Sequence, residues 1–341
     1  MDSSVISQLF INMTTKKRIQ WIDIAKGISI ILVVYGHSGL NNVPIIGSWL
    51  HAYRMPFFFF VSGLLFSGAK YDTIVPFLRK RVKTLYRPYF LFSAVLMLGI
   101  WLLNDPRFST REHMLQYIKT GWEGWALWFI PVLSLTEILF YYVTKICNRG
   151  GEIAVLFTLA IIGRLAYIYS LPNPYNLWFV LTAVMFYGFG SLSKNVVINL
   201  SKQNLFKVMA ASCLFLTASF IYLMSPDLPE FAVNNMASIW IYPAAFCGAL
   251  FMCTFAMVLE RITNNIVIAV KSFIIYIGKN SYIVLAFHQI ILQLLGKTGI
   301  FPNGVLQRIA MWLILGVLIY MIVNYYPAII GRAKPAKAEI A

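Results

Sequence analysis

Two basic side chains near the amino terminus have types and spacing that suit them to a joint role. Lys26 and His37 lie eleven positions apart, separated by a largely apolar run. At 100° per residue this spacing is about three helical turns, so both side chains face the same side of a helix, roughly 16 Å apart along its axis. Considered on its own, Lys26 could be a membrane-interface anchor or a partner of Asp23. Considered on its own, His37 could be a packing residue. Their shared face favours chemistry, because imidazole suits proton transfer and ammonium suits an anion.

Three further polar features lie in or beside apolar stretches. Arg54 is either part of an interfacial aromatic belt or a cation that orients an oxygen-rich substrate and offsets developing negative charge. Residues 79–87 place five cations in nine positions, which suits anionic lipid or a polyphosphate ligand. His288 lies near the middle of an apolar stretch, where a packing histidine is the alternative to a catalytic one. Two other ionisable residues within apolar stretches are expected to be structural: Glu137 and Arg164.

The elements that must position these residues are membrane helices. Hydrophobic residues make up 60% of the 341 residues and charged residues only 12%, with a mean hydropathy of +0.73. A soluble protein usually has about 25% charged residues, so the composition excludes a chain of two soluble domains. The apolar residues fall in blocks of roughly 17–24, long enough to cross a bilayer as helices, and not in the short alternation of an outer-membrane barrel.

We expect an all-α, polytopic membrane protein with about ten transmembrane helices. The expected spans are residues 20–40, 50–68, 88–104, 126–145, 153–170, 177–193, 205–224, 237–259, 281–297 and 308–328. With the amino terminus in the cytoplasm, the cytoplasmic segments hold 20 basic residues and the outer segments five. This asymmetry fits the positive-inside rule with both termini cytoplasmic. The expected division is a cytoplasmic segment over 1–19, a transmembrane domain over 20–328 and a cytoplasmic tail over 329–341.

Several other classes of protein lack sequence support. The four cysteines form no C-x-x-C pair, so we expect neither a disulfide framework nor a metal site. The net charge of +16 comes mainly from basic residues in the expected cytoplasmic segments, so no nucleic-acid partner is expected. The chain has no nucleophile-elbow, phosphate-loop or zinc-protease motif, and residues 1–15 lack the apolar region of a signal peptide.

Five motifs spread over residues 20–330 carry a family resemblance. They are residues 21–27 leading to Gly36 and His37, residues 55–59 with 61–63, the basic cluster ending at residues 86–88, residues 127–130, and residues 278–282 with His288. In these motifs the chain resembles the acyltransferase-3 family of integral membrane acyltransferases, and its fucose 4-O-acetylase-like branch in particular. The first motif is the most specific, since it matches the basic-x10-His pattern of the family with Lys26 in the basic place.

The resemblance implies ten membrane helices in a bacterial cytoplasmic membrane. It also implies an acyl-CoA donor, usually acetyl-CoA taken from the cytoplasm, and transfer to a sugar hydroxyl of an envelope glycan. The expected catalytic residues are His37, as general base or acylated nucleophile, with His288 and Arg54. The residues expected to hold the CoA phosphates are Lys26, Arg79, Arg81 and Arg87, and those expected at the acceptor substrate are Trp128 and Ser62. Some relatives add an SGNH domain for a second transfer, which here is expected to be absent or to require an envelope partner protein.

Two other classes of function compete with this interpretation. A transporter or flippase of a glycan or anionic substrate would also use intramembrane His, Lys and Arg, although no internal repeat is evident. A membrane scaffold would give no reason for Lys26 and His37 to share a face. Among acceptors, a lipid-linked O-antigen or capsule sugar, peptidoglycan and a small metabolite all remain open.

Overall fold

A computed structural model describes residues 18–37, 44–103, 110–120, 125–221, 239–300 and 304–332. Every regular element in these ranges is a helix, which confirms the all-α prediction. The helices are α2 (Gln20–His37), α3 (Pro44–Leu64), α4 (Ile74–Arg81), α5 (Arg87–Leu103), α6 (Thr110–Thr120), α7 (Phe129–Ile146), α8 (Arg149–Ile168), α9 (Leu177–Leu200), α10 (Leu205–Ser219), α11 (Ile241–Arg261), α12 (Asn265–Lys279), α13 (Ser281–Thr298) and α14 (Gly304–Tyr325).

Six helical segments of the described chain are long and apolar enough to cross a membrane. They are Ile74–Leu102, Ala126–Ile146, Arg149–Ile168, Pro174–Leu200, Ile241–Arg261 and Gly304–Tyr325. A seventh span results if α12 and α13, which are bent by 85° at their junction, count as one. By helix composition the chain is therefore a multi-pass membrane protein, and its described residues hold six or seven candidate spans where ten are expected over the whole chain. The cytoplasmic placement of both termini stays a prediction.

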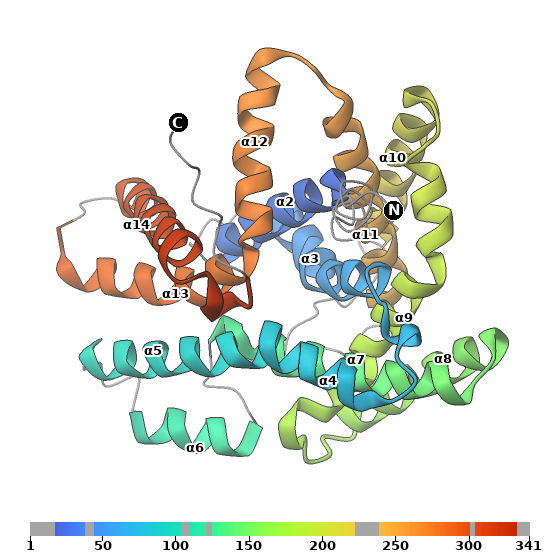
Figure 1. The fold of residues 1–341 in the computed structure, drawn as a ribbon, viewed down its shortest axis with the longest axis horizontal. Helices are drawn as coiled ribbons and strands as arrows, with labels where there is room; N and C mark the ends of the chain where they lie inside the picture. The colour runs from blue at the N-terminus through green and yellow to red at the C-terminus, as the bar shows by residue number, and fades with distance from the viewer. Residues whose placement is uncertain are drawn as a thin grey trace, which may run out of the picture.

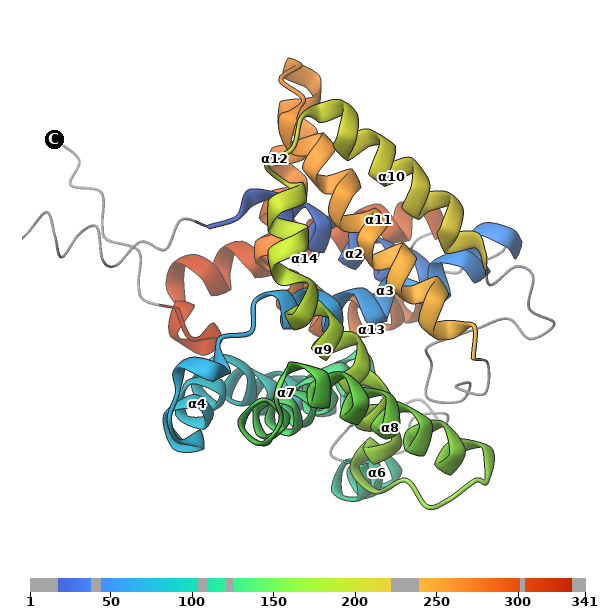
Figure 2. The same cartoon turned by 90° about the vertical axis from the view of Figure 1, so that its right-hand side faces the viewer.

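The helices expected over residues 20–40 and 50–68 account for part of this difference. They form as α2 and α3 but are not among the six candidates. Both lie in the middle of the molecule (Figures 1 and 2), and most side chains of α2 are buried. α2 packs against α3, α11, α12 and α13, and α3 packs against α9 and α11. A helix wrapped by protein can carry polar residues that a lipid-facing helix cannot, and these residues lower its mean hydropathy.

Two glycines allow α2 and α12 to cross with their backbones in contact. A Cβ atom at Gly27 would overlap the carbonyl oxygen of Ile274, and one at Gly278 would overlap the carbonyl oxygen of Asp23. Small residues at such crossings are the usual way for membrane helices to approach closely. The crossing holds the Lys26 end of α2 against the bend between α12 and α13.

The basic cluster also joins this core, through an irregular turn. Residues Val82–Tyr86 form a π-helical turn between α4 and α5, which leaves backbone carbonyls without their usual helical partners. The Tyr282 hydroxyl of α13 donates a hydrogen bond of 2.9 Å to the carbonyl of Leu85 in this turn. The amino-terminal end of α13 is thereby attached to the turn between Arg81 and Arg87.

Gly278→Ala should destabilise the protein, because the new methyl group meets a backbone carbonyl that cannot move independently of α2. We expect a loss of about 1–3 kcal/mol, the usual cost of overpacking. The measurement is the thermal unfolding midpoint of the detergent-purified protein. Gly316→Ala in α14 is the matched control, since its Cβ would have open space and should keep or raise the midpoint. Equal midpoints for the two variants would contradict a close α2–α12 crossing.

Candidate active site

Two histidines that are far apart in the sequence lie side by side. His37 is the last residue of α2, and His288 lies in the middle of α13. Their ring centroids are 5.3 Å apart, and the ring planes are tilted by 44°. The His288 side chain is fully buried, whereas His37 is exposed. The sequence singled out each histidine, and the structure brings the two together with the buried ring behind the accessible one.

The Gln289 side chain joins His37 to the start of α7. The backbone N–H of Ala126 donates a hydrogen bond of 2.8 Å to Gln289 Oε1, and Gln289 Nε2 lies 3.1 Å from His37 Nδ1. Since a backbone N–H can only donate, the amide oxygen must face Ala126 and the amide nitrogen must face His37. The sequence did not identify Gln289 as a site residue. Its only signal was its position next to His288.

The hydrogen bonds of His288 leave one ring nitrogen available. Its Nδ1 lies 2.9 Å from the carbonyl oxygen of Val284 and 3.1 Å from that of Leu285. Carbonyl oxygens accept hydrogen bonds, so in the neutral ring Nδ1 carries the proton and Nε2 has the lone pair. Nε2 is buried and has no hydrogen-bond partner within the described residues. This nitrogen is part of the imidazole ring that lies beside the His37 ring.

Arg54 of α3 adds a buried positive charge beside the end of α2. Its side chain is 7% exposed, and a Cβ atom at Gly36 would overlap its guanidinium, so Gly36 makes room for it. Its Nη2 atom lies 3.4 Å from Nδ1 of His51, one turn earlier on α3. The Ser29 hydroxyl donates a 3.1 Å hydrogen bond to the Arg54 carbonyl and fixes α3 against α2. Arg54 thus lies against the residue that precedes His37.

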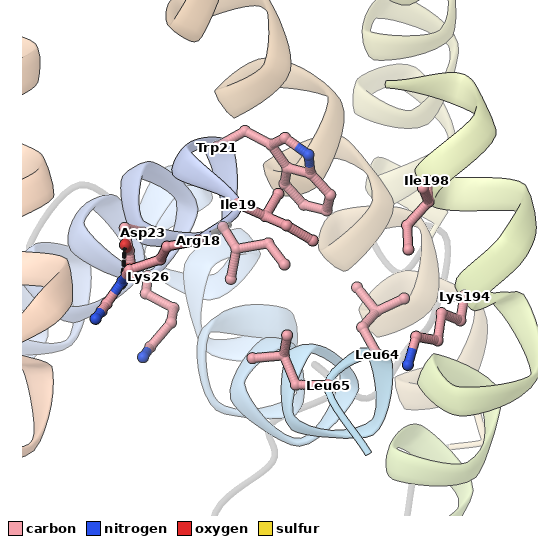
Figure 3. A pocket seen from close by; sticks show the side chains of 10 residues that line it. Arg18, Ile19, Trp21, Asp23, Lys26, Leu64, Leu65, Lys194 and Ile198 are labelled. Atoms are coloured by element: carbon pink, nitrogen blue, oxygen red, sulfur yellow. Dashed lines mark hydrogen bonds and ion pairs between the residues drawn. The ribbon is translucent and has the colours of Figure 1, made fainter. Parts of the chain in front are cut away.

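At the other end of α2, Lys26 lines a cavity of about 480 Å³. Figure 3 shows Lys26 on one side of this cavity and Lys194 of α9 on the other. Arg18 also lines the cavity and forms an ion pair with the buried Asp23, with Nη2 2.9 Å from Oδ1. Most of the remaining lining is apolar. Three cations against one carboxylate give this cavity a net positive charge.

Lys26 also lines a second, smaller cavity of about 180 Å³. Its other lining residues include Ile30, Met55, Ser62, Phe129 and Leu285. Ile30 lies about one turn beyond Lys26 towards His37, and Leu285 lies about one turn before His288. The smaller cavity therefore extends from Lys26 in the direction of the two imidazoles.

The two residues predicted at the acceptor have different positions. Ser62 lines the smaller cavity directly. Trp128 is half-buried, and its ring packs against Phe179 at 5.6 Å and Phe129 at 6.3 Å between centroids. Because Phe129 itself lines the cavity, Trp128 supports the cavity wall from behind.

The arginines of the basic cluster do not share one environment. Arg81 forms an ion pair with the buried Glu137, with 2.8 Å between Nε and Oε2, and the Tyr187 hydroxyl donates a 3.2 Å hydrogen bond to the same carboxylate. Arg79 and Arg87 are exposed. None of the three arginines lines either cavity next to Lys26. Glu137, expected to be structural, is the partner that anchors α4 to α7.

The site can hold an anion at one end and move a proton at the other. Two imidazoles and a guanidinium lie near one end of α2, and two cavities lined by Lys26 lie nearer its other end. Neutral imidazoles suit general acid–base catalysis, and a guanidinium stabilises developing negative charge. Among the described residues, no group of three or more His, Cys, Asp or Glu is placed to hold a metal ion.

Arg81→Met should lower the stability of the protein, because it leaves the buried Glu137 carboxylate without its cation. Removing one partner of a buried ion pair costs about 3–5 kcal/mol. Arg79→Met, on the exposed face of α4, is the matched control and should cost little. Thermal unfolding in detergent measures both. A Glu137→Gln change that rescues the Arg81→Met variant would confirm that the loss comes from the unpaired carboxylate, and two unchanged midpoints would contradict it.

A family model described as an acyltransferase domain (Acyl_transf_3) matches residues 19–326. Comparisons with curated proteins and with solved structures found no match. The matched range includes Lys26, His37, Arg54 and His288, and it covers most of the chain. The chain therefore belongs to the acyltransferase-3 family, and it is a multi-pass membrane acyltransferase.

Proposed function

We propose that this acyltransferase moves an acetyl group from cytoplasmic acetyl-CoA to a sugar hydroxyl of a cell-envelope glycan, such as a precursor of O-antigen or capsule. The observation that carries the proposal is the cavity of about 180 Å³ that begins at Lys26 and extends towards the two imidazoles. A mostly apolar cavity with a lysine in its lining suits the pantetheine arm of CoA, whose phosphates need positive charge.

The length of α2 fits this donor. Lys26 and His37 are roughly 16 Å apart along the helix axis. Extended phosphopantetheine is roughly 18 Å long, counted from its bond lengths. A donor whose phosphates lie near Lys26 therefore brings its thioester to the imidazoles, where the acceptor hydroxyl must also arrive.

The donor phosphates would meet cations from several elements. Lys26 is the deepest of the cations proposed to bind the phosphates and lines the smaller cavity. Arg79 and Arg87, both from the basic cluster, are exposed at the surface. Arg81 belongs to the proposed set, with its charge partly offset by Glu137. The larger cavity adds Arg18, which is paired with Asp23, and Lys194 on the side opposite Lys26 (Figure 3).

In the proposed reaction, the acceptor oxygen bonds to the thioester carbonyl carbon and the carbon–sulfur bond breaks. His37, as general base, takes the hydroxyl proton, which then passes to the CoA thiolate. The Arg54 guanidinium stabilises the negative charge that develops on the carbonyl oxygen. His288 orients His37 or contacts the acyl group, while Ser62 and Trp128 shape the cavity in which the groups meet.

The acceptor would approach the His37 end of α2. His37 is exposed, whereas the Lys26 end is occupied by the donor in this proposal. With the amino terminus in the cytoplasm of a bacterial cell, this end faces the outer leaflet of the cytoplasmic membrane. A lipid-linked glycan held at the membrane surface reaches such a site, as expected of an enzyme similar to the fucose 4-O-acetylase-like branch, with or without an envelope partner protein.

His37→Ala tests the proposed chemistry. With purified protein in nanodiscs and acetyl-CoA labelled on the acetyl group, we expect wild type to release CoA and to label a lipid-linked glycan fraction. The variant should lose about 10²–10⁴-fold in rate, the usual contribution of acid–base catalysis. His113→Ala in α6, an element outside the site, is the control. Label transfer by His37→Ala at the wild-type rate would remove His37 from the mechanism. No acetyl-CoA binding at all, even by wild type, would favour a transporter.

Lys26→Met tests the donor end of the site separately. A charge-assisted hydrogen bond is worth about 1.5–3 kcal/mol, so the KM for acetyl-CoA should rise by about 10- to 150-fold while kcat changes less. Lys207→Met, at an exposed position of α10, controls for the loss of one positive charge. A fall in kcat with an unchanged KM for acetyl-CoA would contradict a role in donor binding.

A further inference from the structure

The hydrogen bonds around His37 determine which of its ring nitrogens carries the proton. A neutral imidazole has one N–H donor and one lone pair. Gln289 Nε2, which can only donate, lies 3.1 Å from His37 Nδ1. The lone pair of neutral His37 is therefore on Nδ1, where the Gln289 amide covers it, and the proton is on Nε2.

The backbone of the 3-10 turn Ala126–Trp128, which precedes α7, prevents the Gln289 amide from turning over. In the reverse orientation, the amide N–H groups would face the backbone N–H of Ala126, which now donates a 2.8 Å hydrogen bond to Gln289 Oε1. Two donors would then face each other, and the Ala126 N–H would lose its acceptor at a cost of about 1–3 kcal/mol. One backbone group thus fixes the amide, and the amide fixes the imidazole.

We propose that Gln289 is a positioning residue of the acyl-transfer site. It holds neutral His37 with the proton on Nε2 and the Nδ1 lone pair covered, so that His37 is not an active base until an acceptor hydroxyl displaces the amide from that lone pair. This inference rests on the function proposed above. It assigns to Gln289 the control of when the base works.

The benefit of such control is that the thioester is protected from water. His37 is exposed, so water can reach it whenever a donor is bound without an acceptor. In hydrolysis, water would give one proton to His37 and its oxygen to the acyl carbon, and CoA would leave as the thiol once that proton reached its sulfur. A base whose lone pair is covered cannot take the first proton, so the donor is spent on the acceptor.

The charged groups that face His37 act in the same direction. Arg54 and His51 approach it from α3, and His288 approaches it from α13. The positive charge of the Arg54 guanidinium makes protonation of the His37 ring less favourable. The Gln289 N–H occupies the Nδ1 lone pair and so opposes protonation of that nitrogen. Both favour the neutral ring.

Gln289→Glu should reverse which ring nitrogen of His37 carries the proton, while the new side chain keeps the shape of glutamine. One carboxylate oxygen can accept from the Ala126 N–H and the other can accept from a protonated His37 Nδ1, which places the lone pair on Nε2. The carboxylate also stabilises the imidazolium, so the acidic limb of the pH–rate profile should move up by about 1–3 pH units. Gln293→Glu, at an exposed position further along α13, is the matched control for the added charge.

The first measurement is nitrogen NMR of the full chain in nanodiscs with ring-labelled histidine. The His37 signals are those that disappear in His37→Ala. In the wild type we expect an unprotonated Nδ1 and a protonated Nε2, and in Gln289→Glu we expect the reverse. This measurement needs no turnover, so it separates a failure of the inference from a failure of the proposed function. A protonated Nδ1 in the wild type would overturn the inference.

The second measurement compares CoA release without acceptor and acyl transfer with acceptor. In Gln289→Glu, acceptor-independent CoA release should rise by about tenfold or more relative to transfer, since general-base assistance is worth about 10²–10⁴. Gln289→Asn, which is too short to span Ala126 and His37, should raise the same ratio without adding charge. The ratio of acceptor-independent CoA release to acyl transfer could instead be the same in Gln289→Glu, Gln289→Asn, Gln293→Glu and the wild type. That result would show that Gln289 is only structural.

Discussion

The structure depends on keeping one polar helix away from lipid. α2 carries Asp23, Lys26 and His37, and an aspartate or lysine at the centre of a bilayer costs about 2.5–3.5 kcal/mol even on insertion scales. The protein meets this constraint by surrounding α2 with α3, α11, α12 and α13. Gly27 and Gly278 let α2 and α12 approach until their backbones touch, so little space is left for lipid beside the charges. Helices such as α14, which bury fewer side chains, can be almost wholly apolar.

The same enclosure matters for the proposed function. Although neighbouring helices pack closely along α2, two cavities of the described part of the chain share Lys26 as a lining residue. In the proposed function, this end of the helix would bind the anionic part of the donor, and the His37 end would transfer the proton. Enclosure also strengthens each electrostatic interaction, since fewer waters screen the guanidinium of Arg54 from a charge that develops near His37.

Helical periodicity was enough to predict part of this site, and tertiary contacts decided the rest. The shared face of Lys26 and His37 follows from their spacing alone, and the motifs pointed to Arg54 and His288. No sequence pattern shows that Ala126 meets Gln289, or that Arg81 pairs with Glu137, because each contact joins separate elements. Two of the expected spans lie outside the six candidates of the described residues for a related reason. Apolar runs predict helices, but only packing reveals that α2 and α3 are covered by protein and not by lipid.

In the proposed function, the donor binds at one end of α2 and the acceptor at the other, so transfer requires both to be bound at the same time. α13 has contacts with both regions. Tyr282 contacts the turn within the basic cluster, Leu285 lines the smaller cavity, and His288 and Gln289 lie beside His37. A small shift of α13 on donor binding would therefore be transmitted to the imidazoles through one rigid helix. Gln289 also depends on α7, whose first turn begins beside Ala126 and whose Phe129 lines the same cavity. In the proposed function, the position of His37 would thus depend on whether the cavity is filled, and this dependence would favour transfer of the acyl group over its loss to water.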